Sequence, residues 1–226
     1  YCDVAPSMNT INWALTKKII GLGAQFFIIM VCMLFIFQVI NIIIVRVCGP
    51  ENVTAYNIAY KYFNILNMAM MIIVTPFWSA CADAYTKKDF LWMKNVIEKM
   101  EMIWKLSICV LIIMILVSST FYDIWVGDSV KISLSLSVMV GVYILVQNLC
   151  GIYIYMINGT SKIRLQLVVY LVSAFISVPT MYFLCSKYGI TVMLLVPISV
   201  CLIQAFVAKK QLTKIIRGTA SGIWIK

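Results

Sequence analysis

Long runs without a charged residue alternate with short charged segments along this chain. These runs cover residues 19–45, 62–82, 106–122, 132–161, 165–186 and 188–208. A helix needs about 20 mostly apolar residues to cross a hydrocarbon core of roughly 30 Å. The pattern therefore predicts an all-α integral membrane protein with six transmembrane helices. We expect them over about residues 19–46, 54–82, 105–123, 132–158, 165–186 and 188–208.

The connection between the second and third spans has a different pattern. Within residues 86–104, apolar residues recur at steps of three and four from Phe90 to Trp104, with charged residues between them. This spacing is typical of an amphipathic helix. We expect that helix to lie on the cytoplasmic membrane surface and to lead into the third span. Trp104 and Trp125 flank this span, as aromatic residues do at membrane interfaces.

Basic residues are divided unequally between the two sides of the predicted spans. With the N-terminus in the cytoplasm, 14 of the 18 Lys and Arg residues fall in cytoplasmic segments. The outer four are Arg46, Lys61, Lys131 and Lys187. Because cytoplasmic loops carry an excess of basic residues, we place both ends of this segment in the cytoplasm. The basic tail and the amphipathic segment would then face anionic membrane lipids, which are expected partners.

The chain divides into three parts. We expect a cytoplasmic linker over residues 1–18, a six-helix transmembrane lobe over 19–210 and a basic cytoplasmic tail over 211–226. The first 18 residues are polar and show no signal-peptide pattern. The chain is therefore interpreted as a piece of a longer protein.

Composition narrows the function further. Apolar residues make up 63% of the chain and charged residues only 12%, too few to cover a soluble surface. The net charge of +10 does not indicate nucleic acid, because the basic residues separate apolar runs and form no single face. The chain has no histidine, which excludes His-ligated metals and Ser-His-Asp triads, and its eight cysteines show no C-x-x-C spacing. We predict no enzyme activity, no catalytic residue, no metal site and no cofactor.

Several short motifs, taken in their order and spacing, resemble those of a known transporter family. They are Gly21 and Gly23 before Phe26, CGPENV at 48–53, YNIAYKYF at 56–63, TPFWSA at 75–80 and NGT at 158–160. In this order they resemble the C-terminal lobe of bacterial polysaccharide flippases. These are the O-antigen and capsule repeat-unit translocases of the multidrug/oligosaccharidyl-lipid/polysaccharide exporter superfamily.

The resemblance implies a transporter with two six-helix lobes around a cavity, in which the N-terminal lobe of the same protein is the partner of this one. It implies alternating access that flips an undecaprenyl-pyrophosphate-linked oligosaccharide across the bacterial inner membrane. A polysaccharide polymerase and glycosyltransferases are further implied partners. Flippases often carry an acid beside the asparagine in the first span of this lobe. Here Ile40 precedes Asn41, which argues against ion coupling through this helix.

Two basic residues and four amides are the candidate substrate-binding residues. Lys61 lies two turns inside the second span if that span begins near Val53, and an ammonium there is costly unless it faces a watery cavity. Together with Arg46, it is suited to bind a pyrophosphate. In the alternative, both side chains extend to the outer headgroups, and we favour this for Arg46.

The four amides are Gln38, Asn41, Gln147 and Asn148, which stand within otherwise apolar spans. Such residues commonly hydrogen-bond to neighbouring helices. Binding of sugar hydroxyls in a cavity is the alternative.

Two other functions stay open. A multidrug or cation antiporter of the same superfamily would place acids inside the spans, whereas here they stand only at span ends. A membrane polysaccharide polymerase or acyltransferase is expected to have a large outer loop or a buried catalytic His or Asp. All the predicted outer loops are short.

Overall fold

Helices account for nearly all of the residues that the structure describes. The computed structural model describes residues 13–127 and 130–225, and this part of the chain contains no strand. The helices are α1 (Trp13–Phe37), α2 (Val39–Cys48), α3 (Pro50–Thr86), α4 (Phe90–Trp125), α5 (Leu134–Thr160), α6 (Arg164–Tyr188), α7 (Ile190–Met193), α8 (Leu195–Ile216) and the short 3-10 helix η4 (Gly222–Trp224).

Six helical stretches of the described residues are long and apolar enough to cross a membrane. They are Leu15–Cys48, Pro50–Thr86, Phe90–Trp125, Leu134–Thr160, Arg164–Tyr188 and Ile190–Ile216. The first contains α1 and α2, and the last contains α7 and α8. The predicted all-α membrane fold with six spans is confirmed.

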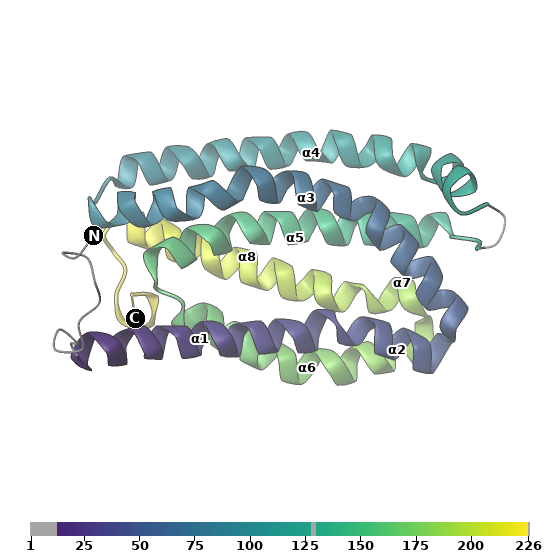
Figure 1. Cartoon of the computed structure of the whole chain (residues 1–226), viewed down its shortest axis with the longest axis horizontal. Coiled ribbons are helices and arrows are strands. Elements are labelled where there is room, and N and C mark those ends of the chain that lie inside the picture. The colour runs from purple at the N-terminus through teal and green to yellow at the C-terminus, as the bar shows by residue number, and fades with distance from the viewer. Residues whose placement is uncertain (1–12, 128–129, 226) are drawn as a thin grey trace, which may run out of the picture.

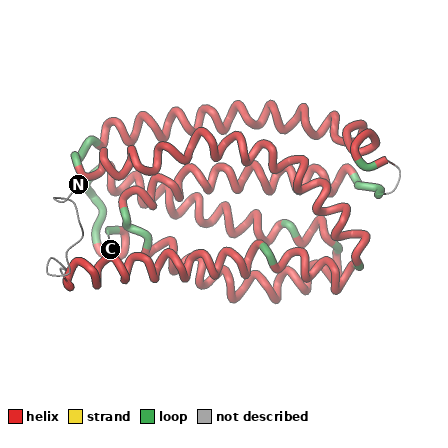
Figure 2. The backbone as a smooth tube through the Cα atoms, in the orientation of Figure 1, coloured by secondary structure: helices red, strands yellow, loops and turns green. Residues whose placement is uncertain are grey.

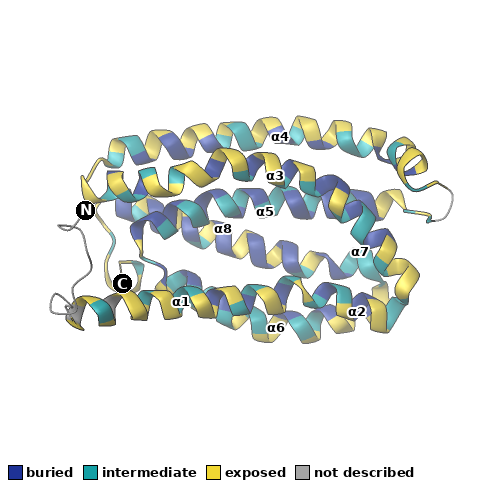
Figure 3. Ribbon diagram, viewed as in Figure 1, coloured by how far each residue is buried: buried dark blue, intermediate teal, exposed yellow. Residues whose placement is uncertain are grey.

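The spans run antiparallel in sequence order, so both described ends of the chain lie at the same end of the bundle (Figure 1). Short connections join the helices at the two ends (Figure 2). Helix α5 is the most buried span and packs against α3, α4 and α8, while α1 packs against α6. The outer faces of α4 and α6 expose apolar side chains such as Leu116 and Phe175 (Figure 3). Such faces suit contact with lipid or with another membrane helix.

Local sequence explains where several helices begin. Gly49 adopts a φ of 90°, a conformation that favours glycine, and Pro50 follows at the first turn of α3, where its missing N–H is not needed. Asp89 caps α4 by accepting a hydrogen bond from the Trp92 N–H at 3.0 Å. The break between α7 and α8 falls just before Pro197, which has no N–H to donate to the preceding turn.

Gly159 allows a close approach between α5 and α3. A Cβ atom at this position would lie 2.9 Å from the Trp78 carbonyl oxygen and 3.0 Å from the Cys81 Cβ. The Cys81 thiol donates to the Met156 carbonyl at 3.4 Å across the same contact. The motifs at 75–80 and 158–160 therefore meet at a helix crossing that needs a residue without a side chain.

The segment at 86–104 differs from its prediction. It is not a separate surface helix, because α3 continues to Thr86 and residues 90–104 form the first turns of the continuous helix α4. Four of its apolar side chains, those of Met93, Val96, Ile97 and Met100, are buried. Trp104 also connects two helices, because its Nε1 donates a hydrogen bond to the Leu145 carbonyl at 2.8 Å and ties α4 to α5.

The two predicted end segments are also more structured than expected. Residues 1–12 of the predicted linker lie outside the described residues, but residues 13–18 already belong to α1. In the predicted tail, residues 211–216 continue α8. The Gln211 side-chain nitrogen donates to the carbonyls of Lys162 at 2.9 Å and Trp224 at 3.1 Å, so the end of the chain is held against the bundle.

Candidate substrate cavity

A cavity of about 640 Å³ opens between the first span, α3 and α5, and we call it the α1–α3–α5 cavity. It is lined by Met30, Met33, Leu34, Phe37, Gln38, Asn41, Tyr56, Asn57, Tyr60, Lys61, Tyr143 and Gln147. Its volume lies within the roughly 300–1,000 Å³ that is usual for small-molecule sites.

Helical spacing explains why these side chains share one wall. On α3, Tyr56 and Tyr60 are four residues apart, as are Asn57 and Lys61, so the two pairs stack on adjacent strips of the helix surface. Tyr143 stands four residues before Gln147 on α5. On the first span, Gln38 occupies the break between α1 and α2.

Four of the six candidate residues from the sequence line the cavity: Gln38, Asn41, Lys61 and Gln147. Lys61 stands eleven residues after Pro50, which is about 16 Å along α3 at 1.5 Å per residue. Its side chain is exposed and forms no ion pair with a described residue.

Arg46 and Asn148 do not line the cavity. Arg46 is exposed in the last turn of α2, near the turn into α3. Asn148 is only 2% exposed and borders a separate small hollow beside Met70 and Met71. Although Asn148 follows Gln147 directly, adjacent residues on a helix point about 100° apart.

Sequence reasoning missed Asn57 and the three tyrosines of the cavity wall. The available signal was the four-residue spacing of Tyr56 with Tyr60 and of Asn57 with the candidate Lys61. Tyr143 could have been found in the same way, from its spacing to Gln147.

The aromatic rings of the wall form a continuous row. Ring centroids are 5.9 Å apart for Tyr56 and Tyr60, and 6.3 Å apart for Tyr60 and Tyr143. Phe37 extends the row from the first span, at 6.3 Å from the Tyr143 ring. These separations are usual for interacting aromatic pairs.

The polar side chains of this wall make no hydrogen bond to any described residue. This holds for the amides of Gln38, Asn41, Asn57 and Gln147, for the hydroxyls of Tyr56, Tyr60 and Tyr143, and for Lys61. The amide oxygens of Asn41 and Gln147 are buried without a partner, as are both amide atoms of Asn148. The expected hydrogen bonds between helices are therefore absent at all four candidate amides, within the part of the chain that the structure describes.

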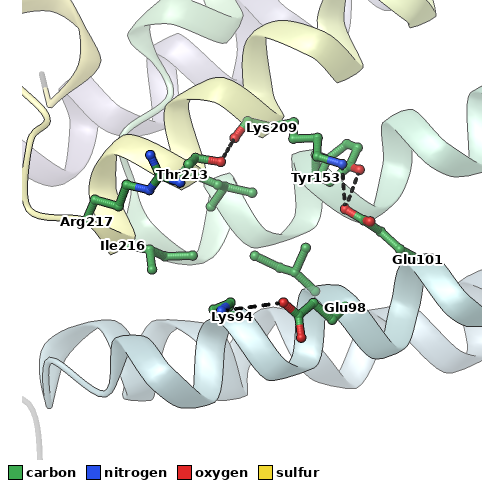
Figure 4. Close-up of a pocket in the computed structure, with 10 residues that line it drawn as sticks. Lys94, Glu98, Glu101, Tyr153, Lys209, Thr213, Ile216 and Arg217 are labelled. Atoms are coloured by element: carbon green, nitrogen blue, oxygen red, sulfur yellow. Dashed lines mark hydrogen bonds and ion pairs between the residues drawn. The ribbon is translucent and has the colours of Figure 1, made fainter.

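A second polar region lies between α4, α5 and α8, near the end of the bundle that holds both described chain ends. Its pocket of about 380 Å³ contains what we call the terminal cluster, formed by Glu101, Tyr153 and Lys209 (Figure 4). Glu101 accepts a hydrogen bond from the Tyr153 hydroxyl at 2.7 Å and forms an ion pair with the Lys209 ammonium at 3.0 Å. That ammonium also lies 5.6 Å from the Tyr153 ring centroid. The described residues contain no group of three or more His, Cys, Asp or Glu side chains that could hold a metal ion.

Six apolar spans are typical of a multi-pass membrane protein, and the partly polar cavity among them is suited to bind a ligand. The MatE family model matches residues 26–183, well over half of the chain, and this chain belongs to the MatE family. Members of this family are membrane efflux or flippase transporters, not enzymes. No curated protein and no solved structure matches the chain.

Proposed function

We propose that this chain is one lobe of a flippase that moves an undecaprenyl-pyrophosphate-linked oligosaccharide across the bacterial inner membrane, for O-antigen or capsule synthesis. One observation carries the proposal. Lys61 is a charged side chain on the wall of the α1–α3–α5 cavity, and no acid is among the lining residues.

The sign of this charge separates the proposal from its main rival. A pyrophosphate leaving water needs a counter-charge where the dielectric constant is low, and an ammonium supplies one. A cationic drug would instead be repelled by Lys61 and would find no carboxylate on this wall. The cavity therefore favours an anionic cargo over the cation of a multidrug antiporter.

The proposed mechanism is alternating access. The headgroup and sugars occupy the cavity while the lipid tail remains in the bilayer, and the lobe then rocks against a second one to open on the other side. We place this second lobe N-terminal to the chain in the same protein, with both ends of the present lobe in the cytoplasm. The upstream coding sequence should then encode six further apolar spans, and an upstream soluble domain would contradict this arrangement.

The test uses the full-length protein that contains this chain, reconstituted in liposomes. Two compounds are offered: a fluorescent isoprenyl-pyrophosphoryl oligosaccharide and ethidium, an organic cation. We expect transfer of the oligosaccharide lipid between leaflets, and no transport of ethidium. Lys61→Gln should slow the transfer at least about tenfold, because one charge-assisted contact is lost. Lys61→Arg should retain part of the activity, because it keeps the charge and changes the shape.

Lys105→Gln is the matched control. Lys105 is also an exposed lysine within a membrane helix, it forms no ion pair with a described residue, and it lies outside the cavity. This variant should flip the lipid at the parental rate. Parental transfer by a folded Lys61→Gln protein would show that the headgroup charge is met elsewhere. Transport of ethidium without the lipid would favour the antiporter.

A further inference from the structure

The cavity wall offers groups that both donate and accept hydrogen bonds. The amides of Asn41 and Gln147 have a donor and an acceptor each, and so do the hydroxyls of Tyr60 and Tyr143. All four are without a partner among the described residues. A phosphate only accepts hydrogen bonds and an ammonium only donates them, so neither satisfies such groups fully. A hydroxyl group both donates and accepts hydrogen bonds. A ring that carries several hydroxyl groups therefore complements this wall best.

Tyr60 gives the same wall a partly exposed aromatic ring, which the buried rings of Tyr56 and Tyr143 support from behind. Tyr60 and Tyr143 come from different helices, yet their ring planes are inclined by only 32° at a centroid separation of 6.3 Å. The faces of aromatic rings carry partial negative charge. They attract the weakly positive C–H groups on the face of a sugar ring, whose hydroxyls point outward around its edge.

Resting on the proposed function, we propose that the α1–α3–α5 cavity binds a sugar residue of the cargo. The sugar ring packs on the partly exposed ring of Tyr60, and its hydroxyls exchange hydrogen bonds with Asn41 and Gln147. Lys61 meets the adjoining pyrophosphate. The wall thus recognises the sugar and the lipid phosphate with different residues.

Binding to the detergent-purified full-length protein tests this division. The probes are sugar-free isoprenyl pyrophosphate and three derivatives that carry one hexose, one N-acetylhexosamine or one 6-deoxyhexose. We expect at least one derivative to bind about tenfold more tightly than the sugar-free lipid, which corresponds to about 1.4 kcal/mol. Gln147→Met and Tyr60→Leu should bring the ratio of the two affinities, with sugar to without sugar, close to one. They should leave the affinity for the sugar-free lipid unchanged. Tyr60→Phe keeps the ring and should keep most of the ratio.

Two variants keep the result interpretable. Gln204→Met removes another buried amide whose oxygen has no partner, but Gln204 is outside the cavity, so it should leave the ratio unchanged. Lys61→Gln should weaken all four compounds by the same factor. No variant removes a hydrogen bond between described residues, so each should fold, and the melting temperature verifies this.

The two proposals fail in different ways. Equal affinity for all four compounds, or a ratio that survives both Gln147→Met and Tyr60→Leu, would overturn the sugar site and leave the flippase function intact. Absence of binding by every isoprenyl pyrophosphate, with and without sugar, would overturn the flippase function and the sugar site together.

Discussion

The α1–α3–α5 cavity and the terminal cluster each combine a lysine with tyrosine and further polar side chains between membrane helices, three tyrosines in the cavity and one in the cluster. They differ in how these polar groups are satisfied. In the terminal cluster, Glu101 is hydrogen-bonded to Tyr153 and ion-paired with Lys209. In the cavity, neither Lys61 nor the tyrosine hydroxyls have a partner among the described residues. A satisfied network joins helices, whereas an unsatisfied wall costs stability and is suited to bind a ligand.

Reversing the cavity charge should have the largest effect. In Lys61→Glu, a carboxylate would face the pyrophosphate, and like charges at close range cost several kcal/mol. We expect transfer of the lipid-linked oligosaccharide to fall at least about a hundredfold, with an unchanged melting temperature because Lys61 is exposed and unpaired. A reconstituted flipping assay and a thermal melt measure the two quantities. Substantial residual transfer would mean that the cargo does not pass close to Lys61.

Removing the acid of the terminal cluster should lower stability and leave transport unchanged. Glu101→Ala leaves the Tyr153 hydroxyl and the Lys209 ammonium without their acceptor, and the Glu101 side chain is only 21% exposed. We expect the free energy of unfolding to fall by about 1–2 kcal/mol, with unchanged transport per folded molecule. Thermal melts in detergent measure this loss. Glu98→Ala is the control, since Glu98 is 61% exposed and its pair with Lys94 is 3.8 Å long. An equal loss in both variants would contradict the distinction between the two regions.

Two matched hydroxyl deletions should give the smallest effect. Tyr153→Phe removes a charge-assisted hydrogen bond and should lower the free energy of unfolding by about 1 kcal/mol. Tyr143→Phe removes a hydroxyl that has no partner in the described chain and should leave that free energy within about 0.5 kcal/mol of the parent. Denaturation of both variants under the same conditions measures the difference. If Tyr143→Phe is the more destabilising variant, the cavity wall contributes to the fold.

The helices were predictable because the membrane sets a strict requirement on length and charge. Each predicted span overlaps one of the six long apolar helical stretches, although breaks at Gln38 and Leu194 divide the first and the last. The amides at 38, 41 and 147 share a wall with Lys61. The exception was residues 86–104. An amphipathic pattern has the same spacing whether the apolar face meets lipid or a bundle, so it did not show that Met93 and Met100 pack inside.

The sequence by itself determined that this protein is a six-span membrane bundle, because uncharged runs of about 20 residues have one stable environment. Only the tertiary structure decided which polar residues share a site. Gln147 lines the cavity, whereas its neighbour Asn148 borders a separate hollow. Trp104 donates a hydrogen bond to a backbone carbonyl on α5. Hydrophobicity specifies that a helix enters the membrane, but its rotation is set by packing against its neighbours. That rotation leaves Lys61 and the tyrosines of the cavity unpaired and joins Lys209 and Tyr153 to Glu101.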